Sequence, residues 1–363
     1  MPELASLETG SANSAGGEAS LTAAIGVLHR LRDAVRGQVI GRDEVIELAV
    51  IALTADGHVL LEDFPGSGKT TLAKAIGEAI GDDQGDNGDN GDSANPGKSH
   101  GHDREAAHFI APFRRIQFTP DLLPSDVTGA PVFDSASNAF HFRHGPVFAH
   151  VLLADEINRT SPKVQSAMLE AMGEKQVTVD NATYPLDALF FVIATQNPLD
   201  LVGTYPLPVP QLDRFLFKIT MAHIDRQAEL EVLDTWRDRR DNSGGAPVVS
   251  RNEILAARAA IDREVAIADA IKSTLVDISR NLRADERVLQ GNSTRSLVLM
   301  LPALQAAAAL RGRDFVSAED IELLLPRVLG HRLELTPGVA DLGRILHDNM
   351  REPLERLAKS TLA

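Results

Sequence analysis

The sequence predicts an α/β fold, in which a parallel sheet is covered by helices on both faces, followed by a second, helical part. Two observations carry this prediction. Short apolar runs of strand length alternate with helical patterns as far as about residue 221, and only helical patterns follow from about residue 222. One run, residues 151–154, is apolar throughout, as expected for a strand that is buried in a parallel sheet. With 363 residues, the chain is long enough for two domains with separate cores.

The first elements lead to a connection between a strand and a helix. Residues 1–20 are rich in Ser, Gly, Ala and Glu, which predicts a disordered tail. Helical periodicity runs from residue 21 to about residue 36 and again over 44–55, and an apolar strand follows at 58–61. The next helix is expected over 72–80. A strand and a helix joined by a glycine-containing connection form a common setting for phosphate binding.

The connection itself is typical of a phosphate-binding loop, since it reads Glu62-Asp-Phe-Pro-Gly-Ser-Gly-Lys-Thr-Thr71. Its glycines let backbone N–H groups turn toward a phosphate chain, and the helix N-terminus adds its dipole. Lys69 would neutralise the β- and γ-phosphates, and the Thr70 hydroxyl would ligate Mg²⁺. Asp63 stands where the full pattern has glycine, and its carboxylate could face the negative charge of a nucleotide. The alternative is an ordinary glycine-rich turn. The predicted nucleotide contacts are Pro65, Gly66, Ser67, Gly68, Lys69, Thr70 and Thr71.

Two acids follow the buried strand in Val151-Leu-Leu-Ala-Asp-Glu156. Because the carboxyl ends of parallel strands open into the ligand crevice, Asp155 is expected to hold Mg²⁺ and Glu156 to polarise the attacking water. A further strand, 189–195, ends just before Asn197, whose amide can orient the same water. Taken alone, a strand capped by solvated acids and an Asn-Pro turn would also explain these residues. The phosphate-binding loop upstream favours the catalytic interpretation.

Several longer phrases between about residues 37 and 332 carry a resemblance to a known family. They are Phe118-Thr-Pro-Asp-Leu-Leu-Pro-Ser-Asp-Val-Thr-Gly129, Ala154-Asp-Glu-Ile-Asn-Arg159, Gln165-Ser-Ala-Met-Leu-Glu-Ala-Met172, Gly203-Thr-Tyr-Pro-Leu-Pro208, Gln211-Leu-Asp-Arg-Phe-Leu-Phe217 and Gly291-Asn-Ser-Thr-Arg295. Together they resemble AAA+ ATPases and, within them, the MoxR family. The resemblance implies an AAA+ P-loop NTPase core with a sheet ordered 5-1-4-3-2, an insert within helix 2 and a hairpin before sensor 1, followed by an all-α lid.

The same resemblance assigns roles to individual residues. It implies Walker A at Lys69 and Thr70, Walker B at Asp155 and Glu156, sensor 1 at Asn197, an arginine finger at Arg214 and sensor 2 at Arg295.

Arg214 can also be argued from its position. It directly precedes an apolar strand at 215–219, where it is poorly placed for its own nucleotide but suits one bound by a neighbouring subunit. The alternative is a structural ion pair with Asp213 or another acid. Arg295 opens a helix after Ser293, a residue that can cap helices, and is a candidate for carrying the nucleotide state into the second domain.

The remaining elements of the first part are less regular. Residues 81–106 are dominated by Gly, Asp, Asn and Ser, which predicts a flexible surface insertion. A strand at 114–117 is followed by Thr-Pro-Asp at 119–121, which signals a helix start. The segment from there through Phe142 resembles the helix-2 insert. Alternation over 176–184 around an Asp-Asn turn predicts a hairpin, which either faces a ring pore or partner or merely covers an edge.

The second part is predicted from its helical patterns and one capping signal. The patterns cover residues 226–237, 251–264, 266–282 and 294–311, and Ser317 caps a last amphipathic stretch through residue 329. The predicted organisation is a tail (1–20), a nucleotide-binding core (21–221) and a helical lid domain (222–363).

Composition restricts the partners. With 36 basic and 51 acidic residues the net charge is −15, which argues against binding of nucleic acid or of an anionic membrane. No cysteine occurs, so disulfides and thiolate metal sites are excluded. Neither a signal peptide nor an apolar run of bilayer length is expected, and the protein is predicted to be soluble and cytoplasmic.

We therefore predict a MoxR-type AAA+ ATPase that hydrolyses ATP with Mg²⁺ at the interfaces of a homo-oligomeric ring, expected to be a hexamer, and remodels or assembles a partner protein. Members of the family it resembles commonly serve proteins with a von Willebrand A domain, so such a client is implied. Two alternatives stay open. A nucleic-acid-stimulated motor is disfavoured by the acidic charge, and a nucleotide-gated scaffold without turnover is disfavoured by Glu156.

Overall fold

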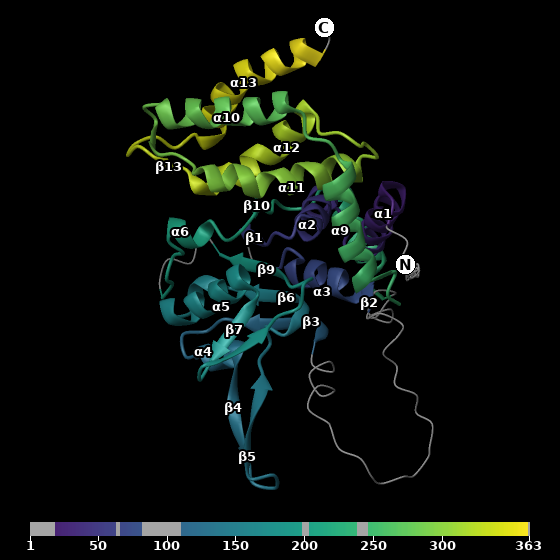
Figure 1. Ribbon diagram of the computed structural model, residues 1–363, viewed down its shortest axis with the longest axis vertical. Coiled ribbons are helices and arrows are strands. Elements are labelled where there is room, and N and C mark those ends of the chain that lie inside the picture. The colour runs from purple at the N-terminus through teal and green to yellow at the C-terminus, as the bar shows by residue number, and fades with distance from the viewer. Residues whose placement is uncertain (1–18, 63–65, 82–109, 198–202, 238–245, 362–363) are drawn as a thin grey trace, which may run out of the picture.

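The structure is a computed structural model and describes residues 19–62, 66–81, 110–197, 203–237 and 246–361. In Figure 1 the α/β core lies below a layer of helices, and a long hairpin projects from the core on the side away from these helices. The predicted tail and insertion lie outside the described residues, except for residues 19–20 and Gly81.

The core is built on one parallel sheet. Its strands lie in the order β10 (Phe217–Thr220), β1 (Val59–Glu62), β9 (Phe191–Gln196), β6 (Ala149–Asp155) and β3 (Ala111–Gln117). Every neighbouring pair is parallel. Counted along the chain, the order is 5-1-4-3-2, so the predicted sheet is confirmed.

Helices cover both faces of the sheet. The side chains of each strand alternate between the two faces, and each face contributes to an apolar cluster that the helices bury. Val151 and Leu153 of β6 belong to the cluster under α1 (Leu21–Gln38), α2 (Asp43–Thr54), α3 (Lys69–Ala79) and α9 (Arg251–Glu264). Leu152 and Ala154 belong to the cluster under α5 (Pro162–Glu174). These four strand residues are fully buried although they face opposite sides of the sheet, which explains why this run is apolar without alternation.

Short paired strands lie outside the main sheet. The projecting hairpin joins β4 (Gly129–Asp134) to β5 (Ala139–His144), and the predicted hairpin before β9 joins β7 (Gln176–Val179) to β8 (Ala182–Pro185). The second hairpin turns at Asp180 and Asn181, both with positive φ of 49° and 65°. A two-residue turn with positive φ at both positions matches the right-handed twist of the two strands that it connects. A short parallel pair, β2 (Ile80–Gly81) with β11 (Val249–Ser250), was not predicted.

The helix predicted to start at Thr119 is wrong. The Leu122 N–H donates to the Thr119 carbonyl at 3.3 Å, so these residues form a turn, for which Pro and Asp are equally suitable. The helix, α4 (Pro124–Thr128), begins later. Leu123 precedes a proline and is extended, with ψ of 155°, which would end any helix begun earlier.

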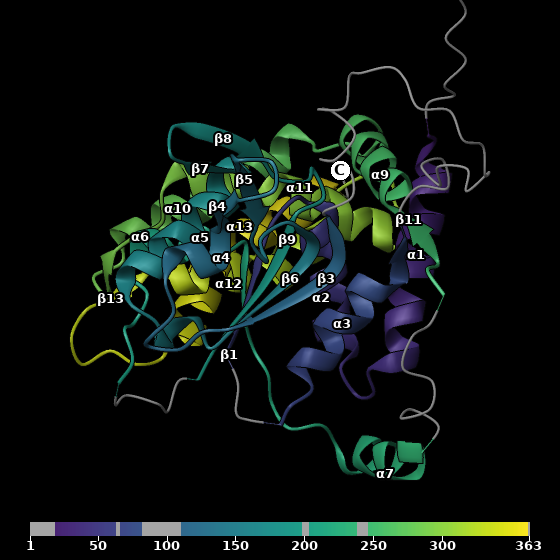
Figure 2. The same cartoon turned by 90° about the horizontal axis from the view of Figure 1, so that it is seen from below.

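The second part is helical, as predicted. It contains α7 (Arg226–Asp234), which Figure 2 shows apart from the other helices, together with α10 (Asp269–Ala284), α11 (Thr294–Leu310), α12 (Ala318–Leu329) and α13 (Leu342–Thr361). Ser317 caps α12 as predicted, through a capping box with Asp320. The sequence did not reveal α13 or the antiparallel pair of β12 (Val288–Gln290) and β13 (Glu334–Leu335).

The predicted boundary at residues 221/222 falls between β10 and α7 and stays a prediction. Among the helices of the described residues, none is both long enough and apolar enough to cross a membrane.

Candidate active site

A cleft of about 440 Å³ opens at the carboxyl ends of the core strands, where ligands bind in open α/β sheets. It brings together most of the residues predicted for nucleotide binding and catalysis. Its lining consists of Gly66, Ser67, Gly68, Lys69, Thr70, Thr71, Arg115, Gln117, Asp155, Glu156 and Asn197. Of the predicted loop, Asp63 and Pro65 lie outside the described residues.

The loop backbone has the geometry that anion binding requires. Gly66 and Gly68 have φ of 88° and 93°, a conformation that costs glycine little and other residues much more. Gly68 directly precedes α3 and has no side chain to cap the helix. The first N–H groups of α3 therefore face the cleft, where they and the helix dipole favour a phosphate.

Thr195 organises the two acids of the cleft and was missed at the sequence level. Its hydroxyl donates to Asp155 Oδ1 at 2.7 Å and accepts from the Glu156 backbone N–H at 2.8 Å. Thr195 is fully buried at the carboxyl end of β9, the neighbour of β6. The only sequence signal was a single hydroxyl at the end of an apolar strand.

Arg115 was also missed. It lies on β3, and its Nη2 is 2.6 Å from Asp155 Oδ2. Both Asp155 oxygens thus already accept a hydrogen bond, but each has a second lone pair for a cation. Because Mg²⁺ prefers oxygen ligands and the Thr70 hydroxyl lines the same cleft, the donor set fits this ion.

Glu156 is held in an uncommon conformation. Its φ of 58° and ψ of 48° place a non-glycine residue in the left-handed region, which tertiary contacts must stabilise. Its Oε2 accepts a hydrogen bond from Gln117 Nε2 at 2.9 Å and lies 3.0 Å from Arg159 Nε. Arg159, for which the sequence gave no role, is therefore an ion-pair partner of Glu156.

Asn197 follows the carboxyl end of β9 and reaches the cleft beside the acids. The preceding residue, Gln196, donates to Glu62 Oε1 at 2.5 Å, and Lys218 pairs with the same oxygen at 2.8 Å. These contacts join three neighbouring strands, β9, β1 and β10, next to the point from which Asn197 projects.

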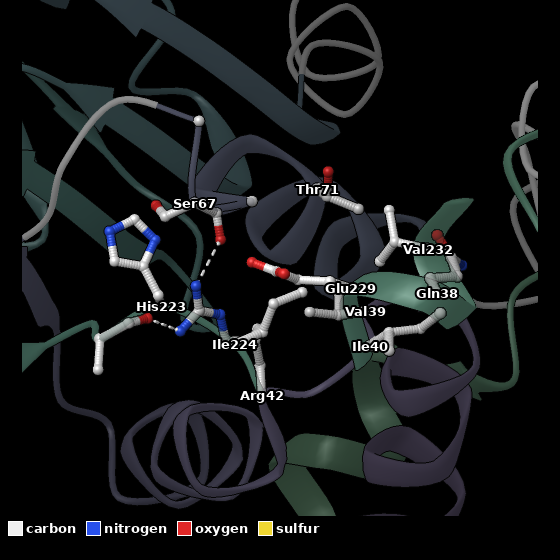
Figure 3. A pocket seen from close by; sticks show the side chains of 13 residues that line it. Gln38, Val39, Ile40, Arg42, Ser67, Thr71, His223, Ile224, Glu229 and Val232 are labelled. Atoms are coloured by element: carbon white, nitrogen blue, oxygen red, sulfur yellow. Dashed lines mark hydrogen bonds between the residues drawn. The ribbon is translucent and has the colours of Figure 1, made fainter. Parts of the chain in front are cut away.

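A second pocket of about 360 Å³ adjoins the cleft and shares Gly66, Ser67, Gly68 and Thr71 with it. Figure 3 shows its other side chains, which come from the end of α1 and the segment joining it to α2, and from α7 and the segment leading into it. They are Gln38, Val39, Ile40, Arg42, His223, Ile224, Glu229 and Val232. Apolar walls with a few polar groups suit a nucleoside. The two hollows together therefore suit a nucleotide.

Arg42 connects the phosphate loop of the cleft with the wall of the second pocket. Its side chain is buried and donates to the Ser67 carbonyl at 3.3 Å and to the Ala222 carbonyl (Figure 3). The phosphate loop and the segment leading into α7 are thereby fixed relative to each other.

Arg214 and Arg295 lie elsewhere; neither lines the cleft or the second pocket. Arg214 precedes β10 at the amino end of the sheet, whereas the cleft is at the carboxyl end. Asp213, its proposed ion-pair partner, pairs instead with Arg332 at 2.6 Å. Among the described residues, Arg214 forms no ion pair within 4.0 Å. Arg295 is exposed on the first turn of α11.

The sheet order, the phosphate loop and the helical second part define the class of the protein as an AAA+ ATPase. Residues 94–217 match the family model "ATPase family associated with various cellular activities (AAA)", and residues 280–348 match the "AAA lid domain" model. A solved structure from Cytophaga hutchinsonii with a provisional ATPase assignment superposes with a TM-score of 0.76 at 33% identity, covering 92% of this chain and 96% of that one.

Two relatives match most of the chain, and the name of one gives the family. Chaperone MoxR1 of Mycobacterium tuberculosis is 33% identical over 88% of this chain and 79% of its own length. The uncharacterized protein YeaC of Bacillus subtilis is 41% identical over 82% of this chain and 84% of its own length. The chain belongs to the MoxR family of AAA+ ATPases.

Proposed function

We propose that the protein hydrolyses ATP with Mg²⁺ at the interfaces of a ring, expected to be a hexamer, and uses the cycle to remodel or assemble a partner protein. The observation that carries the chemical part is the single cleft shared by the phosphate loop, Asp155, Glu156 and Asn197. Phosphoryl transfer needs little covalent chemistry from a protein, so residues that position charge around the phosphates are sufficient.

The phosphates are gripped at one side of the cleft. The loop N–H groups and Lys69 neutralise the β- and γ-phosphates, and the hydroxyl of Thr70 and the carboxylate of Asp155 are the proposed metal ligands. When bound, Mg²⁺ supplies positive charge to the phosphate oxygens. Thr195 keeps the Asp155 carboxylate in its orientation.

The attacking water is positioned at the other side. Glu156 accepts a hydrogen bond from the water, and the Asn197 amide fixes its direction. In the structure the Glu156 carboxylate is engaged by Gln117 and Arg159. Both contacts are made to Oε2, and the carboxylate has further lone pairs that can accept a hydrogen bond from a water in the cleft.

Arg214 completes the site of a neighbouring subunit. The strands β1 and β10 run in parallel from Val59 opposite Phe217 to Glu62 opposite Thr220. Arg214 precedes this pairing and the phosphate loop follows it, so a strand length of about 13 Å separates them. This separation and the lack of an ion pair among the described residues support action in trans. Arg295 is proposed to report the nucleotide state to the lid.

The cellular role is proposed by analogy with the chaperone name of a relative. The client is expected to be a protein, and the resemblance implies one with a von Willebrand A domain, with no part for nucleic acid. The proposed location is the cytoplasm.

Steady-state ATPase activity measured across protein concentrations tests turnover and assembly together, because a trans site loses specific activity on dilution. Glu156→Gln should bind ATP with unchanged affinity and turn it over at least ~10-fold more slowly. Lys69→Ala should lose affinity. Wild-type turnover in Glu156→Gln would overturn its role, and binding without turnover in the wild type would favour a nucleotide-gated scaffold. Stimulation by DNA or RNA would favour a nucleic-acid motor.

Mixing two inactive variants tests the trans role of Arg214. Arg214→Ala subunits retain their own Glu156, and Glu156→Gln subunits retain Arg214, so mixed rings should regain activity at sites that combine the two. Mass photometry with ATP shows whether mixed rings form. Mixed rings without rescue at any ratio would contradict the trans assignment.

A further inference from the structure

The segment that carries Arg214 is held by the lid. Arg332, in the 3₁₀ turn η3 (Gly330–Arg332) after α12, contacts the chain on both sides of Arg214. Its Nε lies 2.6 Å from Asp213 Oδ1, and its Nη2 donates to the Phe215 carbonyl at 2.7 Å and to the Asp213 carbonyl at 3.2 Å. This contact lies where α12 packs against β10 and η3 packs against α6 (Val209–Leu212).

A second lid residue strengthens the contact. His331 Nε2 is 3.0 Å from the Phe215 carbonyl. Burial lowers the pKa of His331 to about 3, so the ring is neutral at physiological pH and its Nε2–H donates. Arg332 Nη1 also donates to the Leu216 carbonyl at 3.3 Å. Four carbonyl and carboxylate groups of one short core segment therefore depend on two adjacent lid residues.

This attachment is rigid because Arg332 is buried. Its side chain is only 2% exposed, against 28% for its partner Asp213. Burial lowers the pKa of Arg332, and Asp213 counteracts this effect. Separation of the two groups would leave the buried Arg332 charge unpaired and would strongly destabilise the protein. We therefore expect Arg332 and Asp213 to move together.

The Arg214 side chain has little room to move on the side that faces the core. A Cβ added to Gly173, in the last turn of α5, would lie 1.5 Å from Arg214 Nη1. The guanidinium therefore rests directly on the α5 backbone. A shift of the lid-held segment must move the guanidinium along this surface.

The lid end of the attachment lies near the other proposed arginine of the site. The charge of Arg295, on the first turn of α11, reaches Arg332 and lowers its pKa further, after the larger effect of burial. The charge of the residue proposed to sense this subunit's nucleotide therefore acts on the residue that holds the Arg214 segment.

We propose that Arg332, through Asp213 and the carbonyls that flank Arg214, is a positioning residue that couples the lid to Arg214. Movement of the lid in one subunit then changes the position of the arginine that this subunit presents to its neighbour's nucleotide. The inference rests on the proposed trans function of Arg214. It assigns a direction to communication in the ring, from the lid of one subunit to the active site of the next.

The alternative is that the ion pair of Arg332 and Asp213 only stabilises the contact between lid and core. A second ion pair between lid and core, of Arg311 and Glu47, provides the control. Arg311, at the end of α11, pairs with Glu47 of α2 at 2.5 Å, and the Glu47 side chain is 27% exposed. Asp213→Asn and Glu47→Gln each neutralise a core carboxylate of similar exposure that receives a lid arginine. Only the first touches the Arg214 segment.

The experiment measures kcat, KM for ATP, melting temperature and ring assembly. Asp213→Asn should lower kcat at least ~10-fold with KM within ~2-fold, because positioning in the transition state is lost while nucleotide binding is retained. Glu47→Gln should keep kcat within ~2-fold of wild type, whatever its melting temperature. The double variant Asp213→Asn/Arg214→Ala should be no slower than Arg214→Ala alone, since both changes remove one contribution.

Two results would overturn the inference: a wild-type kcat in Asp213→Asn, or a double variant that is slower than Arg214→Ala by the full factor of Asp213→Asn. If Asp213→Asn fails to fold, Arg332→Lys replaces it. This variant keeps the charge but cannot contact the Asp213 carboxylate and the flanking carbonyls together, and the same kcat loss and non-additivity are expected. Wild-type kcat in Arg214→Ala would instead refute the proposed function of Arg214, which is a distinguishable outcome.

Discussion

Gly173→Ala tests the position of Arg214 without touching any polar group. The new Cβ would lie 1.5 Å from Arg214 Nη1 and 2.7 Å from its Cζ. The guanidinium must retreat by about 2 Å to reach an ordinary contact distance. Because a flexible side chain can move, the fold should tolerate the change, and alanine favours a helix by up to about 1 kcal/mol. We therefore expect an unchanged or higher melting temperature.

Turnover should respond in the opposite direction. A misplacement of about 1 Å can cost roughly 100-fold in rate, and removal of a trans arginine can cost about 10³-fold or more. We expect Gly173→Ala to lower kcat by about 10- to 100-fold at saturating ATP, measured by phosphate release. Gly26→Ala is the matched control: Gly26 also lies in a helix, α1, but its added Cβ meets only Arg30 Nη1, at an ordinary 3.7 Å. Equal turnover in both glycine variants, with Arg214→Ala inactive, would refute the placement of the guanidinium.

Two further variants test the buried polar contacts. Thr195→Val removes the hydroxyl that joins Asp155 to the backbone N–H of the next residue, and leaving these groups unpaired costs about 1–3 kcal/mol, so turnover should fall about 10-fold or more. Thr160→Val is its control, because Thr160 is equally buried and its hydroxyl has no hydrogen-bond partner among the described residues; equal losses in both variants would contradict the role of Thr195. Burial lowers the pKa of His58 from 6.5 to about 4, so its contribution to stability is present above pH 6.5 and is lost as the pH falls toward 4. In urea unfolding, wild type should lose about 2 kcal/mol more than His58→Asn between pH 7 and pH 5, and parallel losses would show that His58 titrates normally.

Local sequence patterns were sufficient to predict most of the helices and strands. They also revealed the site residues whose role depends on the conformation of their own backbone. The strand at β6 was visible because burial on both faces requires an apolar run, and the loop was visible because its glycines adopt positive φ. The order of the strands came from the resemblance, since periodicity contains no information about lateral neighbours. The helix expected at Thr119 failed because the same three residues also satisfy a turn and a second proline follows.

Residues that act through long-range contacts could not be found this way. Thr195 contacts Asp155 only because β9 lies beside β6, 40 residues apart in sequence. Arg332 and Asp213 are 119 residues apart, and no sequence pattern links them. The sequence shows Gly173 only as a residue near the end of a helix. The structure shows that the Arg214 side chain packs directly against it. In each case the missing information is the register or packing of two distant segments.

The parallel sheet explains why the proposed site is divided between subunits. Its carboxyl end carries the loop, Asp155 and Glu156, while the segment with Arg214 precedes the amino end of β10. No rotation of the lid can bring Arg214 to the cleft of its own chain, because the four paired residues of β1 and β10 lie between them. The proposed coupling instead moves Arg214 relative to its own core, through the hydrogen bonds of Arg332 with the residues on both sides of it. A ring built from such subunits has a physical route by which the nucleotide state of one site affects the rate at the next.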